Sequence, residues 1–212
     1  MLSIRSFQRA LRLPAALLGC AGLVIGLAGC PDPNGSYDDF VARAGKIPPP
    51  PPGECGQTVD SVEGEFFFAL SSQLAKKKPI TFLATLTTDD ADGLSMTLQP
   101  LDKADRATPI GPAIEVGPYP IVDGGFTATL PELVVPGAAN PISAADIRAQ
   151  IRLVGSVCAD FICGTVEGQV IEPVMIALDP MNSRFTMERV TTPGEYPVPP
   201  QINCTGDLAD PL

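Results

Sequence analysis

The chain has 212 residues, with 24 acidic and 14 basic side chains and a formal net charge of −10 at pH 7. This acidic balance disfavours nucleic-acid binding, because non-specific affinity for a phosphate backbone depends on clustered lysine and arginine. The sequence contains no histidine, which excludes a Ser-His-Asp triad, a Cys-His pair and histidine-ligated zinc. We therefore expect no nucleic-acid partner and no enzyme of these classes.

Residues 1–29 have the layout of a secretory signal peptide. Residues 1–12 carry three arginines and no acidic residue, and residues 13–28 form an almost wholly apolar run. Spanning a membrane needs roughly 20 apolar residues, and this run is shorter and contains Pro14 and three glycines. The pattern therefore favours a cleaved signal peptide over a transmembrane helix.

The apolar run ends in Leu27-Ala28-Gly29-Cys30, which resembles the lipobox of bacterial lipoproteins. The resemblance covers only the first 30 residues. It implies cleavage between Gly29 and Cys30, a diacylglyceryl group on the Cys30 thiol and acylation, for example by palmitate, of the new amino terminus. The membrane then becomes a partner through the lipid on Cys30. We expect a location in the cell envelope, with the outer membrane favoured over the inner one and the domain facing the periplasm or the cell surface.

Residues 30–54 are predicted to form a proline-rich tether between the lipid and a folded domain. They include five consecutive prolines, Pro48 to Pro52, and few apolar residues that could build a core. Such a run favours polyproline II, which makes a stiff spacer. Recognition of the prolines by an SH3-like partner is the alternative, but Arg43 and Lys46 are the only basic flanks.

From Cys55 onward, apolar and polar residues alternate with the period of two that is typical of half-buried strands. In residues 80–87 this pattern is clear, and a turn at Asp89–Gly93 leads into a second alternating segment at 94–99, which predicts a hairpin. Further strands are expected at 62–70, 114–116, 126–130, 147–157, 164–171, 174–178 and 184–190. No long segment shows the helical period of 3.6.

Eight or nine short strands predict an all-β domain over residues 55–212, with a proline-rich C-terminal tail. We expect an antiparallel β-sandwich of immunoglobulin-like or jelly-roll topology. A β-barrel is the alternative. The strands are too short, too few and too weakly apolar on their outer faces for an outer-membrane barrel.

The cysteines lie at positions 20, 30, 55, 158, 163 and 204. Removing residues 1–29 and lipidating Cys30 leaves four, which suits two disulfides in an oxidising compartment. We expect Cys158 to pair with Cys163 across a short loop, and Cys55 to pair with Cys204 and so join the two ends of the domain. A metal site at Cys158 and Cys163 is disfavoured because the chain has no histidine and the other thiols are distant in sequence.

Two further groups of oxygen-bearing side chains are candidate sites. Thr88, Asp90 and Asp92, followed by Gly93, have the spacing of a calcium loop, but the bidentate glutamate is missing and a hairpin turn is the favoured interpretation. Glu63 with Glu65, or Glu167 with Glu172, are the candidate carboxylate pairs for glycosidase chemistry. The chain has no tryptophan and three tyrosines, so aromatic faces for a sugar are scarce. We expect no metal and no other cofactor.

These observations predict a membrane-anchored lipoprotein whose β domain is not an enzyme and serves in binding or scaffolding. We expect the ligand to be a protein or a glycan. Two alternatives remain open: a glycan-active or enzyme-accessory module, and a subunit of an envelope or secretion assembly.

Overall fold

The computed structural model describes residues 57–89 and 93–212. These belong to one compact unit, residues 49–212. The predicted signal peptide, the cleavage site at Gly29 and Cys30, and the tether lie outside the described residues. None of the described residues belongs to a helix long and apolar enough to cross a membrane.

The described residues form nine antiparallel strands, and each segment predicted to be a strand is one. The strands are β1 (Gly64–Ser71), β2 (Ile80–Thr88), β3 (Gly93–Pro100), β4 (Ile114–Val122), β5 (Gly125–Val135), β6 (Ile147–Val157), β7 (Phe161–Glu172), β8 (Ile176–Leu178) and β9 (Arg184–Arg189). The predicted hairpin is also confirmed, because β2 pairs with β3 from Phe82 opposite Pro100 to Thr88 opposite Leu94.

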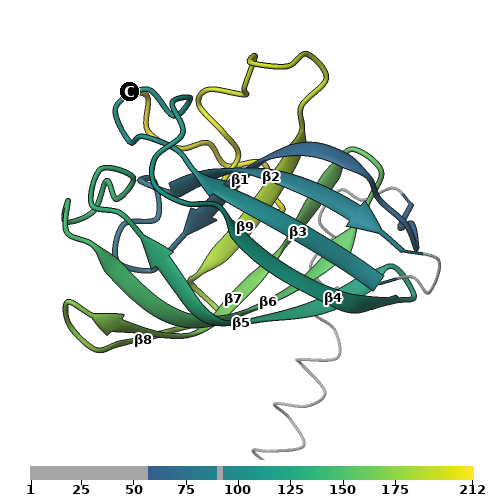
Figure 1. The fold of residues 1–212 in the computed structure, drawn as a ribbon, viewed down its shortest axis with the longest axis horizontal. Coiled ribbons are helices and arrows are strands. Elements are labelled where there is room, and N and C mark those ends of the chain that lie inside the picture. The colour runs from purple at the N-terminus through teal and green to yellow at the C-terminus, as the bar shows by residue number, and fades with distance from the viewer. Residues whose placement is uncertain (1–56, 90–92) are drawn as a thin grey trace, which may run out of the picture. The chain divides into compact units, whose positions relative to one another are not determined.

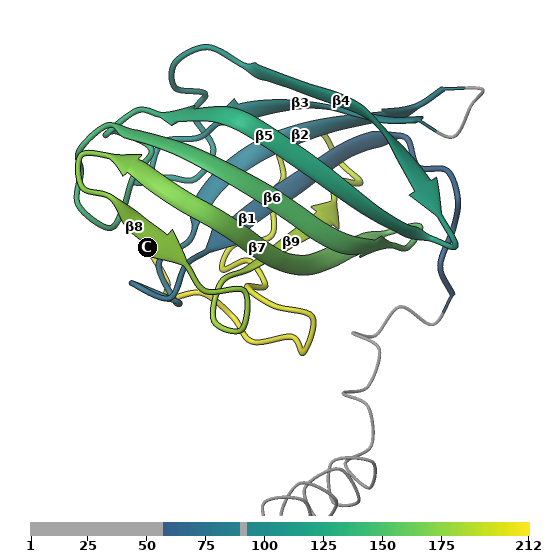
Figure 2. The same ribbon diagram turned by 90° about the horizontal axis from the view of Figure 1, so that it is seen from below.

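The prediction of a sandwich is wrong, because the sheet closes into an eight-stranded barrel (Figures 1 and 2). Strands β1 to β7 each pair with the next strand in the chain. Strand β9 then pairs with both β7 and β1 and so joins the two ends of the sheet. The short β8 pairs with the last part of β7, beyond the reach of β9. Closure leaves no pair of separate sheets to form a sandwich.

Aromatic side chains fill the middle of the barrel. The Phe68 ring lies 5.2 Å from that of Phe82 and 5.9 Å from that of Phe185, and the rings of Phe185 and Phe126 are 6.1 Å apart. Gly164 on β7 makes room for this cluster, since a Cβ there would lie 2.7 Å from the Phe185 ring and 2.0 Å from the Val154 carbonyl oxygen. The centre of the barrel is therefore a packed core.

A second buried layer lies outside the barrel, beneath the C-terminal tail (residues 191–212). Phe66, Phe67 and Phe68 are all buried, although neighbouring side chains of a strand point to opposite faces. Phe67 faces outward and stacks on Tyr196 of the tail, with ring centroids 5.4 Å apart. The tail is also held by the hydroxyl of Thr186 on β9, which donates to the Gln201 carbonyl.

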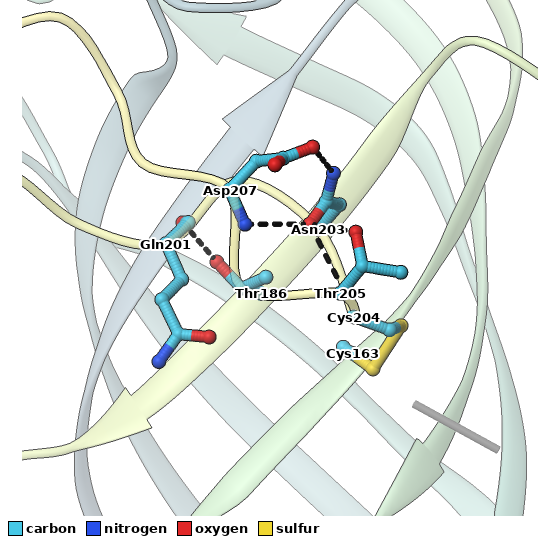
Figure 3. The surroundings of a disulfide bond; sticks show 7 residues. All are labelled: Cys163, Thr186, Gln201, Asn203, Cys204, Thr205 and Asp207. Atoms are coloured by element: carbon cyan, nitrogen blue, oxygen red, sulfur yellow. Dashed lines mark hydrogen bonds between the residues drawn. A yellow bond between two sulfur atoms is a disulfide. The ribbon is translucent and has the colours of Figure 1, made fainter. Parts of the chain in front are cut away.

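The disulfide prediction is wrong in its pairing, because Cys163 bonds to Cys204 (Figure 3). The β6–β7 hairpin explains the error. Its register places Ser156 opposite Cys163, and the Cys158 amide donates to the Phe161 carbonyl. Cys158 and Cys163 are therefore offset along the hairpin rather than directly opposite each other. Cys163 faces outward beside Thr186 of β9. Thr186 also bonds to Gln201 of the tail, and this contact brings the nearby Cys204 to Cys163.

Cys158 is also disulfide-bonded, and we predict that its partner is Cys55, which lies outside the described residues. Thr58 forms a bridge with Cys158, so Cys55 is only three positions away along the chain. Peptide mapping of the non-reduced protein should yield Cys163 joined to Cys204 and Cys158 joined to Cys55. A fragment that links Cys158 to Cys20 or Cys30 would contradict this pairing.

Candidate ligand-binding cavity

The described part of the chain contains an apolar cavity of about 200 Å³ at one end of the barrel. We call this end, where β1, β5 and β7 finish, the open end. The cavity is lined by the last inward-facing residues of these strands, the first ones of β2 and β6, and parts of the connecting loops and β8. The lining residues are Leu70, Ser72, Leu74, Ile80, Leu133, Val135, Ile142, Ser143, Ile147, Ala149, Ile151, Val170, Pro173, Val174, Ile176 and Leu178.

The way the barrel wall is built explains why space remains at this end. Strand β9 begins at Arg184, opposite Thr165, so its large inward side chains Phe185 and Met187 lie nearer the other end. Beyond that point β7 pairs with the three-residue β8. At the open end the interior side chains are aliphatic or small, including Ala149, and the phenylalanine cluster does not extend this far. These smaller side chains do not fill the volume that the barrel wall encloses.

Gln73, which follows β1, bonds to β8 and to the β8–β9 connection at the end of the barrel where β8 takes the place of β9 beside β7. Its side-chain amide nitrogen donates to the Ala177 carbonyl over 2.8 Å. Its side-chain oxygen accepts from the Asp179 amide at 2.7 Å and from the Ser183 hydroxyl at 2.8 Å. One side chain thus supplies the bonds that a neighbouring strand would otherwise make, and it holds the first turn after β1 against the β8–β9 connection.

The β5–β6 connection (residues 136–146) is held in shape by Asn140, which is completely buried. Its side-chain nitrogen donates to the Ser143 hydroxyl and to the Ala145 carbonyl, each over 2.8 Å, and its oxygen accepts from the Ile142 amide at 3.0 Å. Ile142 and Ser143 are thereby fixed as part of the cavity lining. This side of the cavity is preformed.

The cavity opens to solvent between the β1–β2 connection (residues 72–79) and the β7–β8 connection (residues 173–175). Leu74 and Val174, one from each connection, line the cavity and are 51% and 62% exposed. Met175 beside them is also exposed. An apolar molecule would meet apolar side chains from the rim to the floor.

The chemistry of the lining is almost entirely apolar. None of the described lining residues is charged, and the polar side chains among them are Ser72 and Ser143. The Ser143 hydroxyl already accepts a hydrogen bond from Asn140. Such a lining attracts a ligand through removal of apolar surface from water, and it provides no acid, base or ion pair to act on the ligand.

A larger hollow, of about 720 Å³, lies outside the barrel beside the tail. It is lined by Lys76, Lys77 and Arg184 together with Asp207. The Lys76 ammonium already donates to Asn182 over 2.7 Å, and Asp207 accepts from Asn203 over 2.7 Å. We regard this hollow as a surface furrow rather than a ligand site, since charged side chains of both signs line it and several are already bonded within the protein. The enclosed apolar cavity is the better site.

Of the two candidate catalytic carboxylate pairs, Glu167 and Glu172 are each engaged in a surface ion pair. Glu167 pairs with Arg152, and Glu172 with Arg148, on the outer face of the β6–β7 ladder. Among the described residues, the carboxylate whose pKa is raised is Glu188 of β9. Burial beneath the tail raises the pKa of its carboxyl, while hydrogen bonds from Gln201 oppose that shift. Glu188 therefore belongs to the contact between β9 and the tail.

The candidate calcium loop is described in part. Thr88 uses its hydroxyl to accept from the Val62 amide and to donate to the Val62 carbonyl, each over 2.9 Å. The Asp89 carboxylate accepts from the Gly93 amide at 2.7 Å, as a hairpin turn requires. Asp90 and Asp92 lie outside the described residues. Among the described residues there is no group of three or more side chains arranged to hold a metal ion.

The two described tyrosines have structural contacts rather than forming a platform for a sugar. Tyr119 donates its hydroxyl hydrogen to the Thr129 carbonyl, and Tyr196 stacks on Phe67. They lie on a strand and on the tail, away from the cavity lining.

The cavity was not predicted from the sequence, although several of its residues, such as Ile80 and Ile151, lie in segments predicted to be alternating strands. Alternation shows which side chains face inward, but it carries no information on how well they fill the interior. No family model, curated protein or solved structure matches this chain.

Proposed function

We propose that this chain is a membrane-anchored lipoprotein whose barrel binds a small apolar ligand without catalysing a reaction on it. The observation that carries the proposal is the apolar cavity at the open end, enclosed by a preformed wall and reached between Leu74 and Val174. An apolar cavity of about 150 Å³ in another protein holds benzene, so about 200 Å³ suits an occupant slightly larger than benzene.

The absence of catalysis is proposed on the chemistry of the residues. The chain has no histidine, and the described lining has no carboxylate, lysine or cysteine. A reaction at this site would lack a general acid or base, and the serines would lack a partner to activate them. A binding function requires none of these groups.

The anchor is proposed on the sequence of residues 1–30 and on the cysteine count. The segment Leu27–Cys30 follows a basic and then an apolar stretch, and lipidation of Cys30 leaves four cysteines. The bond between Cys163 and Cys204 supports an oxidising compartment such as the periplasm or the cell surface. We therefore propose that the barrel is displayed in the cell envelope on a lipidated tether.

Binding should be detectable with ethylbenzene as the probe. The full chain is held in solution by an amphipathic polymer and equilibrated with ethylbenzene vapour. The vapour pressure sets the activity of the free ligand, so ethylbenzene absorbed by the polymer does not change it. A ligand that prefers the folded state stabilises it by RT ln(1 + [L]/Kd), about 2.7 kcal/mol at a hundredfold excess over Kd. We expect the midpoint of thermal unfolding, followed by circular dichroism, to rise with vapour pressure.

Two matched variants localise this binding. Ala149→Phe places a ring in the cavity and should abolish the response, whereas Ala177→Phe adds the same ring to the exposed outer face of β8 and should retain it. Ala149→Leu replaces Ala149→Phe in this test if the phenylalanine ring prevents folding. Its smaller side chain should reduce the rise in the thermal midpoint only in part. An equal response in wild type and in both Ala149 variants, or no response in wild type, would refute binding in the cavity.

Cys30→Ala should leave an uncut precursor and prevent lipid attachment, since the lipobox resemblance implies that lipidation precedes cleavage. Wild-type protein should partition into a detergent phase and show the mass of a chain that starts at lipidated Cys30, because two or three acyl chains anchor stably where one is marginal. Cys20→Ala is the control and should behave as wild type. Freely soluble wild-type protein, with its mature end at another residue, would disprove the anchor.

A further inference from the structure

Ser72 is the one cavity residue whose polar group is left without a partner in the described part of the chain. It follows the last residue of β1, it is 6% exposed, and its hydroxyl oxygen makes no hydrogen bond there. It lies two positions after the inward-facing Leu70 and lines the cavity with it. A buried hydroxyl without a partner is unfavourable, because it has lost its bonds to water and gained none in return.

Three neighbouring serine hydroxyls at the open end are engaged in hydrogen bonds. Ser71, which faces outward, donates to the Lys76 carbonyl. Ser143 accepts from Asn140, and Ser183 donates to Gln73. Among the buried hydroxyls of the described residues, that of Ser72 is the one without a partner.

We propose that the cavity ligand carries one uncharged hydrogen-bonding group, which pairs with the Ser72 hydroxyl while the rest of the ligand fills the apolar floor. This inference rests on the function proposed above. A hydroxyl both donates and accepts, so an alcohol, ketone or ester oxygen satisfies it. By comparison with the benzene-sized cavity, the enclosed part of the ligand has roughly eight non-hydrogen atoms.

The ligand must be neutral because the lining offers no counter-charge. None of the described lining residues is acidic or basic, and a charge moved out of water without a partner is strongly disfavoured. A carboxylate such as octanoate and an amine such as octylammonium are therefore excluded from the same position. A buried water is a poor substitute, because such waters make about three hydrogen bonds and the lining serines are Ser72 and the already bonded Ser143.

The experiment compares probes that differ in one group. Wild type and Ser72→Ala, as full chains in amphipathic polymer, are equilibrated through the vapour with ethylbenzene or 1-octanol, and titrated with octanoate or octylammonium at pH 7. Affinities come from the rise in the thermal midpoint at known ligand activity. Ser72→Cys is the near-isosteric variant, and Ser71→Ala, on the outward face of the same strand, is the matched control.

We expect Ser72→Ala to weaken 1-octanol binding roughly fivefold or more while ethylbenzene affinity changes by less than about twofold. Ser72→Cys should lie between wild type and Ser72→Ala, because a thiol is a weaker donor and acceptor. Ser71→Ala should leave the ratio of the two affinities unchanged. Octanoate and octylammonium should bind wild type at least about tenfold more weakly than 1-octanol.

Distinct results overturn the two proposals. If ethylbenzene binds wild type but the ratio of 1-octanol to ethylbenzene affinity is the same in wild type and Ser72→Ala, the role of Ser72 is refuted and the apolar binding function stands. Binding of octanoate or octylammonium as tightly as 1-octanol refutes the neutral-ligand assignment. If no probe binds wild type, the proposed function fails and this inference fails with it.

Discussion

Replacing Phe185 with alanine should lower the free energy of unfolding by about 3–5 kcal/mol, the usual cost of removing a fully buried aromatic ring. Phe185 is completely buried on β9, the strand that closes the barrel. Its ring contacts Phe68 and Phe126, and Gly155 and Gly164 leave the space it occupies. The variant therefore loses apolar burial and leaves a void that rigid strands on every side cannot close.

Urea unfolding followed by far-ultraviolet circular dichroism measures this change, since the chain has no tryptophan. Phe185→Leu should cost less because it keeps much of the volume. Val122→Ala is the control, since Val122 is an exposed apolar residue and its truncation should change stability by no more than about 0.5 kcal/mol. A loss below about 1 kcal/mol in Phe185→Ala would contradict a packed core at the centre of the barrel.

Removing the Cys163–Cys204 disulfide, by replacing both cysteines with serine, should cost about 4 kcal/mol. The two residues are 41 positions apart, and in the loop-entropy model a cross-link over such a loop stabilises by about that amount by restricting the unfolded chain. The bond also holds the tail over β9 and β1, where Tyr196 covers Phe67. Loss of this cover should expose the outer face of β1 to solvent.

The measurement is urea unfolding of the double variant beside wild type, with limited proteolysis of the tail as a second readout. We expect faster cleavage within residues 191–212 while the barrel resists. Ethylbenzene binding should persist in the folded double variant, because the cavity lies inside the barrel and the tail lies outside it. Unchanged stability together with an unchanged cleavage rate would show that the tail is held without the disulfide.

The sequence by itself determined the strands of this protein. Inward and outward positions alternate along any strand, so segments such as 80–87 and 147–157 carry the pattern within a few residues. The turn at Asp89–Gly93 is equally local, and it correctly predicted that β2 pairs with β3. The acidic charge and the absence of histidine are properties of composition and do not depend on the fold.

Only the tertiary structure decided between a barrel and a sandwich. The deciding contact is that of β9 with β1, which joins Phe66 to Arg189 across most of the domain. The alternation of apolar and polar residues along a strand is the same in a barrel and in a sandwich. It therefore does not reveal which other strands pair with that strand. The burial of Phe67 has the same origin, because its cover comes from the distant Tyr196.

The disulfide and the cavity were also decided by the three-dimensional arrangement. Cys163 and Cys158 are close in sequence, but the hairpin register offsets them and the tail brings Cys204 to Cys163. The cavity exists because β9 stops short of the open end and the side chains there are too small to fill the barrel. Pairing partners and unfilled volume depend on residues far apart in the chain, which is why no local pattern in the sequence could predict them.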